Sequence, residues 1–207
     1  MGLSLEYEGL QIEVTNETYT PSDDSYLLVE HLKIRPTDVI LEIGTGCGII
    51  ALVAARMAKR VIATDISPAA IQCARKNVKT NQLESKIEIR QGDLFNPIKT
   101  GERFNLILSN PPYLPESKED HQQGAGWLEK AWNGGRSGRK FIDRFIRNCK
   151  PYLEPLGRVQ VVQSSLSNIP KSCELFQKLG FQVELGEVKS FFFEKLVVLT
   201  AQLERKV

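Results

Sequence analysis

Short apolar runs alternate with amphipathic segments along most of the chain. The runs at 38–44, 60–65, 86–93, 103–110 and 157–165 are rich in β-branched residues and have the length of buried strands. Segments with apolar residues at helical spacing lie at 45–59, 67–82, 138–153 and 169–180. This alternation predicts an α/β fold in which helices cover both faces of a mostly parallel sheet.

The two ends of the chain depart from this alternation. Residues 3–16 alternate like a hairpin, and Thr20 is placed to cap a helix over 21–32 with Pro21 at its first position. Residues 181–190 and 194–203 are two β segments without a helix between them. One antiparallel strand is therefore expected near the end of the sheet. We find no repeat or linker, so a single domain over 1–207 is expected.

Composition makes several classes of partner and site less favourable, without excluding polyanionic substrates. Lys+Arg number 27 against 25 Asp+Glu, so no strong overall field favours nucleic acid or a membrane surface. No apolar run approaches the roughly 20 residues of a membrane span, and glutamates stand in the N-terminal segment, so a cytosolic, cytoplasmic protein is expected. The four cysteines form no C-x-x-C pair and have no histidine nearby, which predicts reduced thiols, with neither a zinc site nor a disulfide framework.

Candidate chemistry lies just after the strands, because ligands of parallel sheets bind at the carboxyl ends of the strands. After the first of these strands come Glu42, Gly44, Gly46 and Gly48, where glycines permit a tight turn close to a ligand. The dinucleotide fingerprint needs a glycine at position 49, and this chain has Ile49, which argues against a nicotinamide cofactor.

Two further strand ends carry acids. Asp65 suits a ribose diol, and Asp93 is within reach of an adenine amine in such a fold. Asp65 alone could equally cap the next helix, but acids around a glycine turn favour a cationic, adenosine-containing ligand. S-adenosylmethionine fits this description.

The sequence Asn110-Pro111-Pro112-Tyr113 ends the fourth strand. The Asn110 side-chain oxygen and the Pro111 carbonyl can accept both N–H bonds of a planar nitrogen, and Pro112 fixes the direction of that carbonyl. Tyr113 can supply a flat face beside a sulfonium. This arrangement predicts methyl transfer to an amide or aromatic amine without a strong base.

Other polar residues have a structural interpretation. Asp23 and Asp24 lie in a first helical turn where acids are stabilised by the dipole, and Cys47 fits as a small residue in a crowded turn. His121 is expected to be solvated. The long segment 114–139, with Trp127 and Trp132, is expected to meet the substrate. The basic run over 136–150 is interpreted mainly as a solvated helical face, with an acidic docking site as the alternative.

Together these motifs resemble a known family. "LEIGTGCG", "ATD", "GDLF" and "NPPY", in this order, look like class I S-adenosylmethionine-dependent methyltransferases that act on planar nitrogens. "YTPSDDSYLL" and "AWNGGRSGRKFIDRF" narrow the resemblance to HemK-like release-factor glutamine methyltransferases of the archaeal and eukaryotic type. Asp23 stands where glutamate is expected in this family, and Cys47 where serine is common.

The resemblance implies a Rossmann-like sheet of seven strands, with an N-terminal hairpin and helix over 1–35 packing on the cofactor site. It implies that the glutamine of a Gly-Gly-Gln loop in a translation release factor is the substrate, and that Asn110 to Tyr113 hold its amide. The implied residues around S-adenosylmethionine are Tyr19, Pro21, Ser25, Glu42, Gly44, Gly46, Asp65, Ile66, Asp93, Leu94 and Asn110.

Alternatives remain open at this point. The chain could methylate a protein lysine or an adenine of DNA or RNA, or be a cofactor-binding module without activity. A duplex-binding enzyme would need a further means of gripping its substrate, and none is evident. Relatives work with a small zinc-binding activator protein, and the strand over 86–93, expected at the sheet edge, is a plausible docking position.

Overall fold

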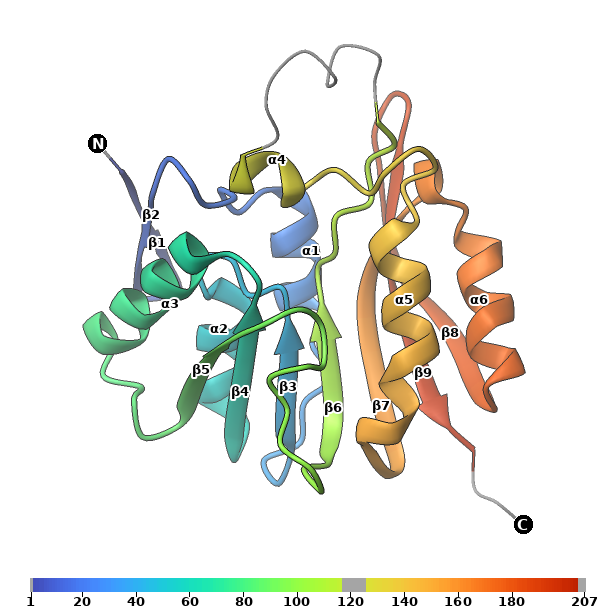
Figure 1. Cartoon of the computed structure of the whole chain (residues 1–207), viewed down its shortest axis with the longest axis horizontal. Helices are drawn as coiled ribbons and strands as arrows, with labels where there is room; N and C mark the ends of the chain where they lie inside the picture. Colours follow the sequence, from blue (N-terminus) through green and yellow to red (C-terminus); the bar gives the residue numbers. More distant parts are fainter. Residues whose placement is uncertain (1, 117–125, 205–207) are drawn as a thin grey trace.

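A computed structural model of the chain describes residues 2–116 and 126–204. Its centre is a seven-stranded sheet in the order β5-β4-β3-β6-β7-β9-β8 (Figure 1). The strands of this sheet are β3 (Val39–Ile43), β4 (Arg60–Asp65), β5 (Ile87–Gln91), β6 (Phe104–Ser109), β7 (Leu153–Ser164), β8 (Phe181–Ser190) and β9 (Lys195–Leu203). Separate from it, β1 (Leu3–Tyr7) and β2 (Leu10–Val14) form the expected antiparallel hairpin.

The direction of the strands confirms the expected topology. β3 pairs in parallel with β4 and β6, β5 pairs in parallel with β4, and β7 with β6. β9 runs antiparallel to both of its neighbours, β7 and β8. β5 lies at one edge of the sheet, as expected for the strand over 86–93.

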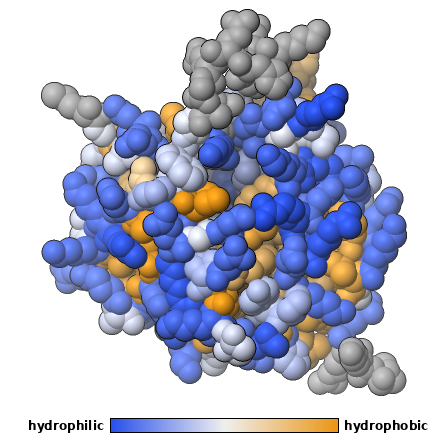
Figure 2. Space-filling model, in the orientation of Figure 1, coloured by the Kyte–Doolittle hydropathy of each residue, from blue (hydrophilic) through white to orange (hydrophobic). Residues whose placement is uncertain are grey.

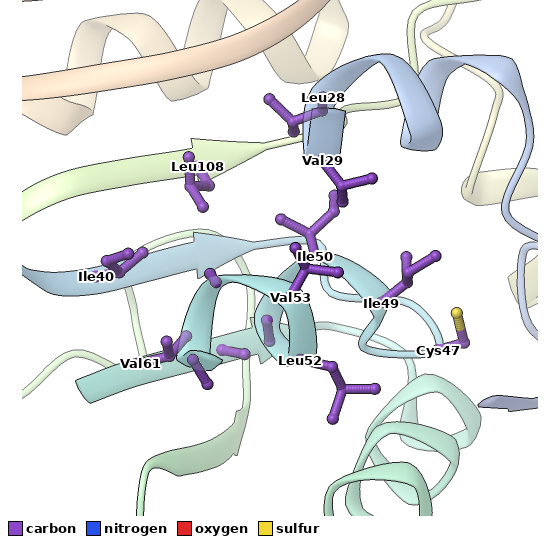
Figure 3. Packing of buried hydrophobic residues seen from close by; sticks show 14 of the residues in the cluster. Leu28, Val29, Ile40, Cys47, Ile49, Ile50, Leu52, Val53, Val61 and Leu108 are labelled. Atoms are coloured by element: carbon purple, nitrogen blue, oxygen red, sulfur yellow. The ribbon is translucent and has the colours of Figure 1, made fainter. Parts of the chain in front are cut away.

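Helices cover both faces of the sheet, because successive side chains of a strand point to opposite faces. The helices are α1 (Asp23–Glu30), α2 (Ile49–Met57), α3 (Pro68–Thr80), α4 (Trp127–Lys130), α5 (Lys140–Cys149) and α6 (Ile169–Lys178). Ile40 of β3 packs in the core with α1 to α3, and the adjacent Leu41 packs in the core with α5 and α6. In the first core, Leu28 of α1 lies near Leu108 of β6 (Figure 3).

The β1–β2 hairpin is attached to the body of the protein by two asparagine side chains, one within α3 and one at its C-cap. Asn77 accepts a hydrogen bond from Glu13 N (2.9 Å) and donates to Glu13 O (2.8 Å), and Asn81 bonds Gln11 in the same way. Asn77 also donates to the Cys47 carbonyl across 2.8 Å, within the turn that follows β3. The hairpin, α3 and this turn are therefore linked through one fully buried amide.

Several element boundaries differ by a few residues from the sequence prediction, and the largest differences concern α1, β7 and the segment 114–139. α1 begins at Asp23 with Ser22 as its N-cap, because the Ser22 carbonyl, not that of Thr20, accepts the first helical bond, from Tyr26 N. β7 begins at Leu153 because Leu153 pairs with Phe104 across a bulge. The segment 114–139 contains the short helix α4 and a bridge between Leu114 and Asn133.

Within the described residues, no helix is long and apolar enough to cross a membrane. The surface seen in Figure 2 is mostly hydrophilic, with hydrophobic side chains visible in patches.

Candidate active site

A cavity of about 350 Å³ opens where the parallel strands end, at the upper edge of the sheet in Figure 1. Segments far apart in the sequence contribute to its wall. Eleven of the predicted site residues line it: Tyr19, Pro21, Ser25, Gly44, Gly46, Asp65, Ile66, Asp93, Leu94, Asn110 and Pro112. Glu42, Pro111 and Tyr113 are not among the lining residues, and lie in or directly after the strands that form it.

The glycine turn after β3 leaves space for a ligand. Gly44 and Gly46 have φ angles of +81° and +56°, and a Cβ added to either would meet no atom within 4 Å. Gly44 N donates to Thr64 O across 2.8 Å, and Gly46 N donates to the Asp65 carboxylate across 2.9 Å. These two N–H groups are thus used within the protein. The turn contributes an open wall to the cavity, in agreement with the tight turn that the sequence predicts.

Glu42 is fully buried beneath this turn. One carboxylate oxygen accepts a hydrogen bond from Thr45 Oγ1 (2.7 Å), whereas Oε1 is buried and has no partner among the described residues. Burial raises the pKa of Glu42 to about 8. A positively charged donor close to Oε1 would stabilise the ionised form of Glu42. The ammonium group of a methionine moiety is a donor of this kind.

Asp65 lies between the glycine turn and the start of α3, whose N-cap is Ser67. Its carboxylate accepts from Ser67 N (2.9 Å), at the start of α3, and from Gly46 N. The residue also lines the cavity. Burial raises the pKa of Asp65, and its backbone hydrogen bonds oppose that shift. Asp65 therefore fixes the turn against α3 while presenting an acceptor to the cavity.

Asp93 forms an ion pair with a residue of the basic run over 136–150. Arg144 of α5 donates to the Asp93 carboxylate across 2.6 Å, and both residues line the cavity. Arg144 is exposed, as the interpretation of the basic run as a mainly solvated face expects, and the ion pair with Asp93 is an addition to it. The interpretation is wrong for Arg139, which is 4% exposed and donates to Asp143, to Ser172 Oγ and to backbone carbonyls. Helical spacing alone did not reveal these partners.

Asn110 projects into the cavity from the end of β6 and is oriented by α1. Its amide nitrogen donates to Ser25 Oγ across 3.2 Å. Its side-chain oxygen is buried and has no partner among the described residues. A buried acceptor without a donor costs free energy, on the order of 1–3 kcal/mol, unless a ligand or water supplies one. This unpartnered oxygen is the atom that the sequence analysis assigned to a substrate amide.

Asp24 connects the two aromatic residues of the site. Tyr19 and Tyr113 both donate their hydroxyls to Asp24 Oδ2, across 3.0 and 3.1 Å. Asp24 lies in the first turn of α1, as expected, but it is buried and accepts hydrogen bonds from both tyrosines, which the sequence did not indicate. Burial, followed by the charge of Asp24, raises the pKa of both tyrosines, which therefore remain hydrogen-bond donors at neutral pH.

Several lining residues were not predicted. Trp127 lines the cavity as expected for the segment 114–139, whereas Trp132 is not among the lining residues. His121 lies outside the described residues. The further residues on the wall include Glu17, Thr18, Thr64, Lys130, Lys140 and Phe141. Glu17 and Thr18 precede the first predicted helix, and no motif or strand end marked them.

Comparison with known proteins agrees with this geometry. Residues 21–138 match the family described as "Methyltransferase small domain". A Methanocaldococcus jannaschii protein named "Putative protein N5-glutamine methyltransferase" is 37% identical, over 95% of this chain and 98% of that protein. The "Release factor glutamine methyltransferase" of Clostridium acetobutylicum is 32% identical over 74% of this chain, which spans 58% of that enzyme.

A solved structure with the same fold is that of the E. cuniculi Mtq2–Trm112 complex, described as responsible for methylation of the eRF1 termination factor. It has a TM-score of 0.66 and 18% identity, and the match covers 91% of this chain and 99% of that chain. The family match covers more than half of the sequence, and the archaeal relative matches almost end to end. The chain therefore belongs to the methyltransferase small domain family, alongside relatives named as protein N5-glutamine methyltransferases.

Proposed function

We propose that this chain is an S-adenosylmethionine-dependent methyltransferase that modifies the side-chain nitrogen of the glutamine in the Gly-Gly-Gln loop of a translation release factor. The observation that carries the proposal is the buried, unpartnered oxygen of Asn110 at the wall of the cavity. The names of the relatives support the same substrate.

The residues of the cavity fit the cofactor. Asp65 can accept from its ribose, and the open turn at Gly44 and Gly46 leaves room for its chain. Glu42 lies beneath this turn and does not line the cavity, and its unpartnered Oε1 would accept from the ammonium group. Asp93 lies where the adenine amine would be expected, and Arg144 holds its carboxylate in place. When bound, S-adenosylmethionine would supply the methyl group as an electrophile.

The chain's own residues would orient the nucleophile. The nitrogen of a carboxamide is delocalised and carries two N–H bonds in one plane; Asn110 Oδ1 can accept one of them and the Pro111 carbonyl the other. Ser25 holds the Asn110 side chain by accepting from its amide nitrogen. This positioning replaces general-base catalysis, because the proton becomes acidic once the nitrogen has gained its fourth bond.

Lysine and adenine fit the site less well. A lysine ammonium must lose a proton before attack, and the two tyrosines nearest Asn110 are protonated donors whose pKa values are raised. Adenine offers the required planar amine, but a duplex substrate also needs binding energy for base flipping. The nearly balanced charge of the chain offers no strong electrostatic source for it.

The substrate is tested by competition at fixed salt. Enzyme and cofactor are incubated with a release factor, its Gln→Asn variant at the Gly-Gly-Gln loop, adenine-containing oligonucleotides and a lysine-rich peptide, and the modified atom is located by fragmentation mass spectrometry. We expect one added methyl group on the Gly-Gly-Gln peptide and none on the variant. Preferential labelling of adenine or lysine would overturn the assignment.

The second part of the proposal is a small zinc-binding activator that adds a strand to β5. β5 is an edge strand, and the structural neighbour is a complex with a second protein. The Ile89 carbonyl faces away from β4 and accepts a hydrogen bond from Arg75 across 3.3 Å, a bond that an added strand would replace.

Co-expression with such an activator should give a complex and raise activity. Gln91→Pro removes an outward N–H of β5 and should weaken the complex, whereas Gln91→Ala at the same exposed position should not. The absence of a complex, with solubility and activity unchanged, would refute this part without affecting the substrate assignment.

A further inference from the structure

The turn between β8 and β9 carries three consecutive phenylalanines. Phe192 is 91% exposed and Phe193 84% exposed, and their rings meet edge to face with centroids 4.4 Å apart. A tight hairpin turn normally uses glycine, asparagine or aspartate. Two large apolar rings in water contribute nothing to the core, on a surface that is otherwise mostly hydrophilic in the view of Figure 2.

The turn is held in a defined shape. Phe191 N donates to Glu194 O across 2.7 Å, and Lys195 N donates to Ser165 Oγ across 3.0 Å. β9 is also paired along most of its length with both β7 and β8. The two rings are thus presented on a fixed support, which reduces the conformational entropy lost when a partner binds.

The turn lies beside the candidate active site. Figure 1 shows it rising at the edge of the sheet where β3 and β6 end. Lys189 of β8 donates to the Asp23 carboxylate across 2.6 Å, and Asp23 precedes Asp24, the acceptor of the Tyr113 hydroxyl. The Glu194 carboxylate lies close enough to Tyr19 and Tyr113 to contribute to the raised pKa of both.

We propose that Phe192 and Phe193 form a docking element for the folded domain of the protein substrate, inserting into an apolar pocket near the loop that carries the methylated glutamine. The inference rests on the proposed function. A stable protein contact buries about 800 Å² on each partner, far more than one glutamine side chain can supply. The surface beside the cavity must therefore contribute, and exposed aromatic residues are the side chains that dominate such contacts.

Two other partners for this turn, a membrane surface and a second copy of the chain, fit less well. Glu187, Lys189, Glu194 and Lys195 flank the phenylalanines, so the charges near the turn are mixed, whereas anionic membranes attract basic clusters. A second copy of the chain would cover the turn but would also obstruct a protein substrate at the adjacent cavity. Both alternatives are outcomes of the experiment below.

The experiment compares two substrates, the intact release factor and a short peptide with its Gly-Gly-Gln sequence. In the variant Phe192→Ser/Phe193→Ser we expect KM for the intact factor to rise about tenfold or more, with kcat, the cofactor Kd and activity on the peptide unchanged. Met57→Ser, which removes an exposed apolar side chain at the far end of α2, should leave KM unchanged.

Further measurements distinguish the possible failures. Thermal denaturation establishes that the variants fold, and Phe192→Trp should restore most of the affinity. A photoreactive phenylalanine analogue at position 192 should cross-link to the intact factor in the presence of S-adenosylhomocysteine. Any of four results for the double variant would overturn the inference alone. These are an unchanged KM for the intact factor, an equal loss of activity on the peptide, dissociation of a dimer that the wild type forms, and loss of vesicle binding that the wild type shows. Failure of the wild-type enzyme to methylate the factor would overturn the proposed function as well.

Discussion

The hydroxyl of Tyr113 donates to Asp24 Oδ2 across 3.1 Å, joining the loop after β6 to the first turn of α1. Tyr19 donates to the same oxygen, and Asp24 Oδ1 accepts from Ser25 N. Ser25 in turn accepts from Asn110. One buried carboxylate thus orients the tyrosine next to the proposed amide site and the serine that holds Asn110.

We predict that Asp24→Asn lowers kcat by about ten- to a hundredfold, the equivalent of losing one hydrogen bond to a charged group, about 1.5–3 kcal/mol. An asparagine has one acceptor oxygen and cannot serve both sets of donors. Steady-state kinetics and cofactor titration measure the effect. Glu30→Gln, an exposed acid at the end of the same helix, is the control. Wild-type kcat in Asp24→Asn would show that the network is dispensable.

Asn110→Ala is expected to lower turnover by about a hundredfold or more while the cofactor Kd stays nearly unchanged, because the substituted group positions the substrate. Ser25→Ala is the matched comparison. It leaves the Asn110 oxygen in place and removes only the group that orients its amide, so its loss should be smaller. Equal losses of turnover and cofactor affinity in Asn110→Ala would contradict the assigned role.

Asp65→Ala should weaken S-adenosylmethionine binding by about 1.5–3 kcal/mol, measured by calorimetry, through loss of hydrogen bonds to the ribose. Because Asp65 also accepts from Gly46 N and Ser67 N, the variant should unfold at a lower temperature. Asp65→Asn separates the effects, since it retains an acceptor without the charge. Unchanged affinity in both variants would leave Asp65 with a structural role alone.

The raised pKa of Glu42 predicts how the stability of the ligand-free protein depends on pH. Its pKa is raised from its ordinary value of 4.5 to about 8, so between these values the folded state holds a proton that the unfolded state has lost. The free energy of unfolding should therefore fall as pH rises through this window, by up to about 1.4 kcal/mol per pH unit. Urea denaturation of wild type and Glu42→Gln measures this; a dependence as steep in the variant would refute it.

The periodic parts of the fold could be predicted because β3, β4 and β6 are short, mainly apolar runs and each long helix has one apolar face. β4 and β8 were expected at the bounds that the structure shows. The four-residue helix α4 could not be found in this way, because it is too short to show helical periodicity. The start of α1 was misplaced because Thr20 and Ser22 are both good N-caps, and local sequence does not distinguish them.

The candidate site was predictable where it depends on strand ends. Gly44, Asp93 and Asn110 come after β3, β5 and β6, and Asp65 is the last residue of β4, so topology alone brings them to one cavity. Long-range partners were not predictable. Arg144 lies 51 positions from Asp93, and no local pattern indicates that the two side chains form an ion pair.

The hydrogen bonds of the Asn77 amide make the glycine turn depend on the N-terminal hairpin. This amide serves β2 as a substitute for a neighbouring strand and holds the Cys47 carbonyl of the glycine turn. If the hairpin is removed, this amide loses two of its partners in a buried position and is free to reorient away from the turn. Deletion of β1 and β2, which do not line the cavity, would then disorder the glycine turn in its wall. The two strands therefore stabilise the cofactor site from a distance.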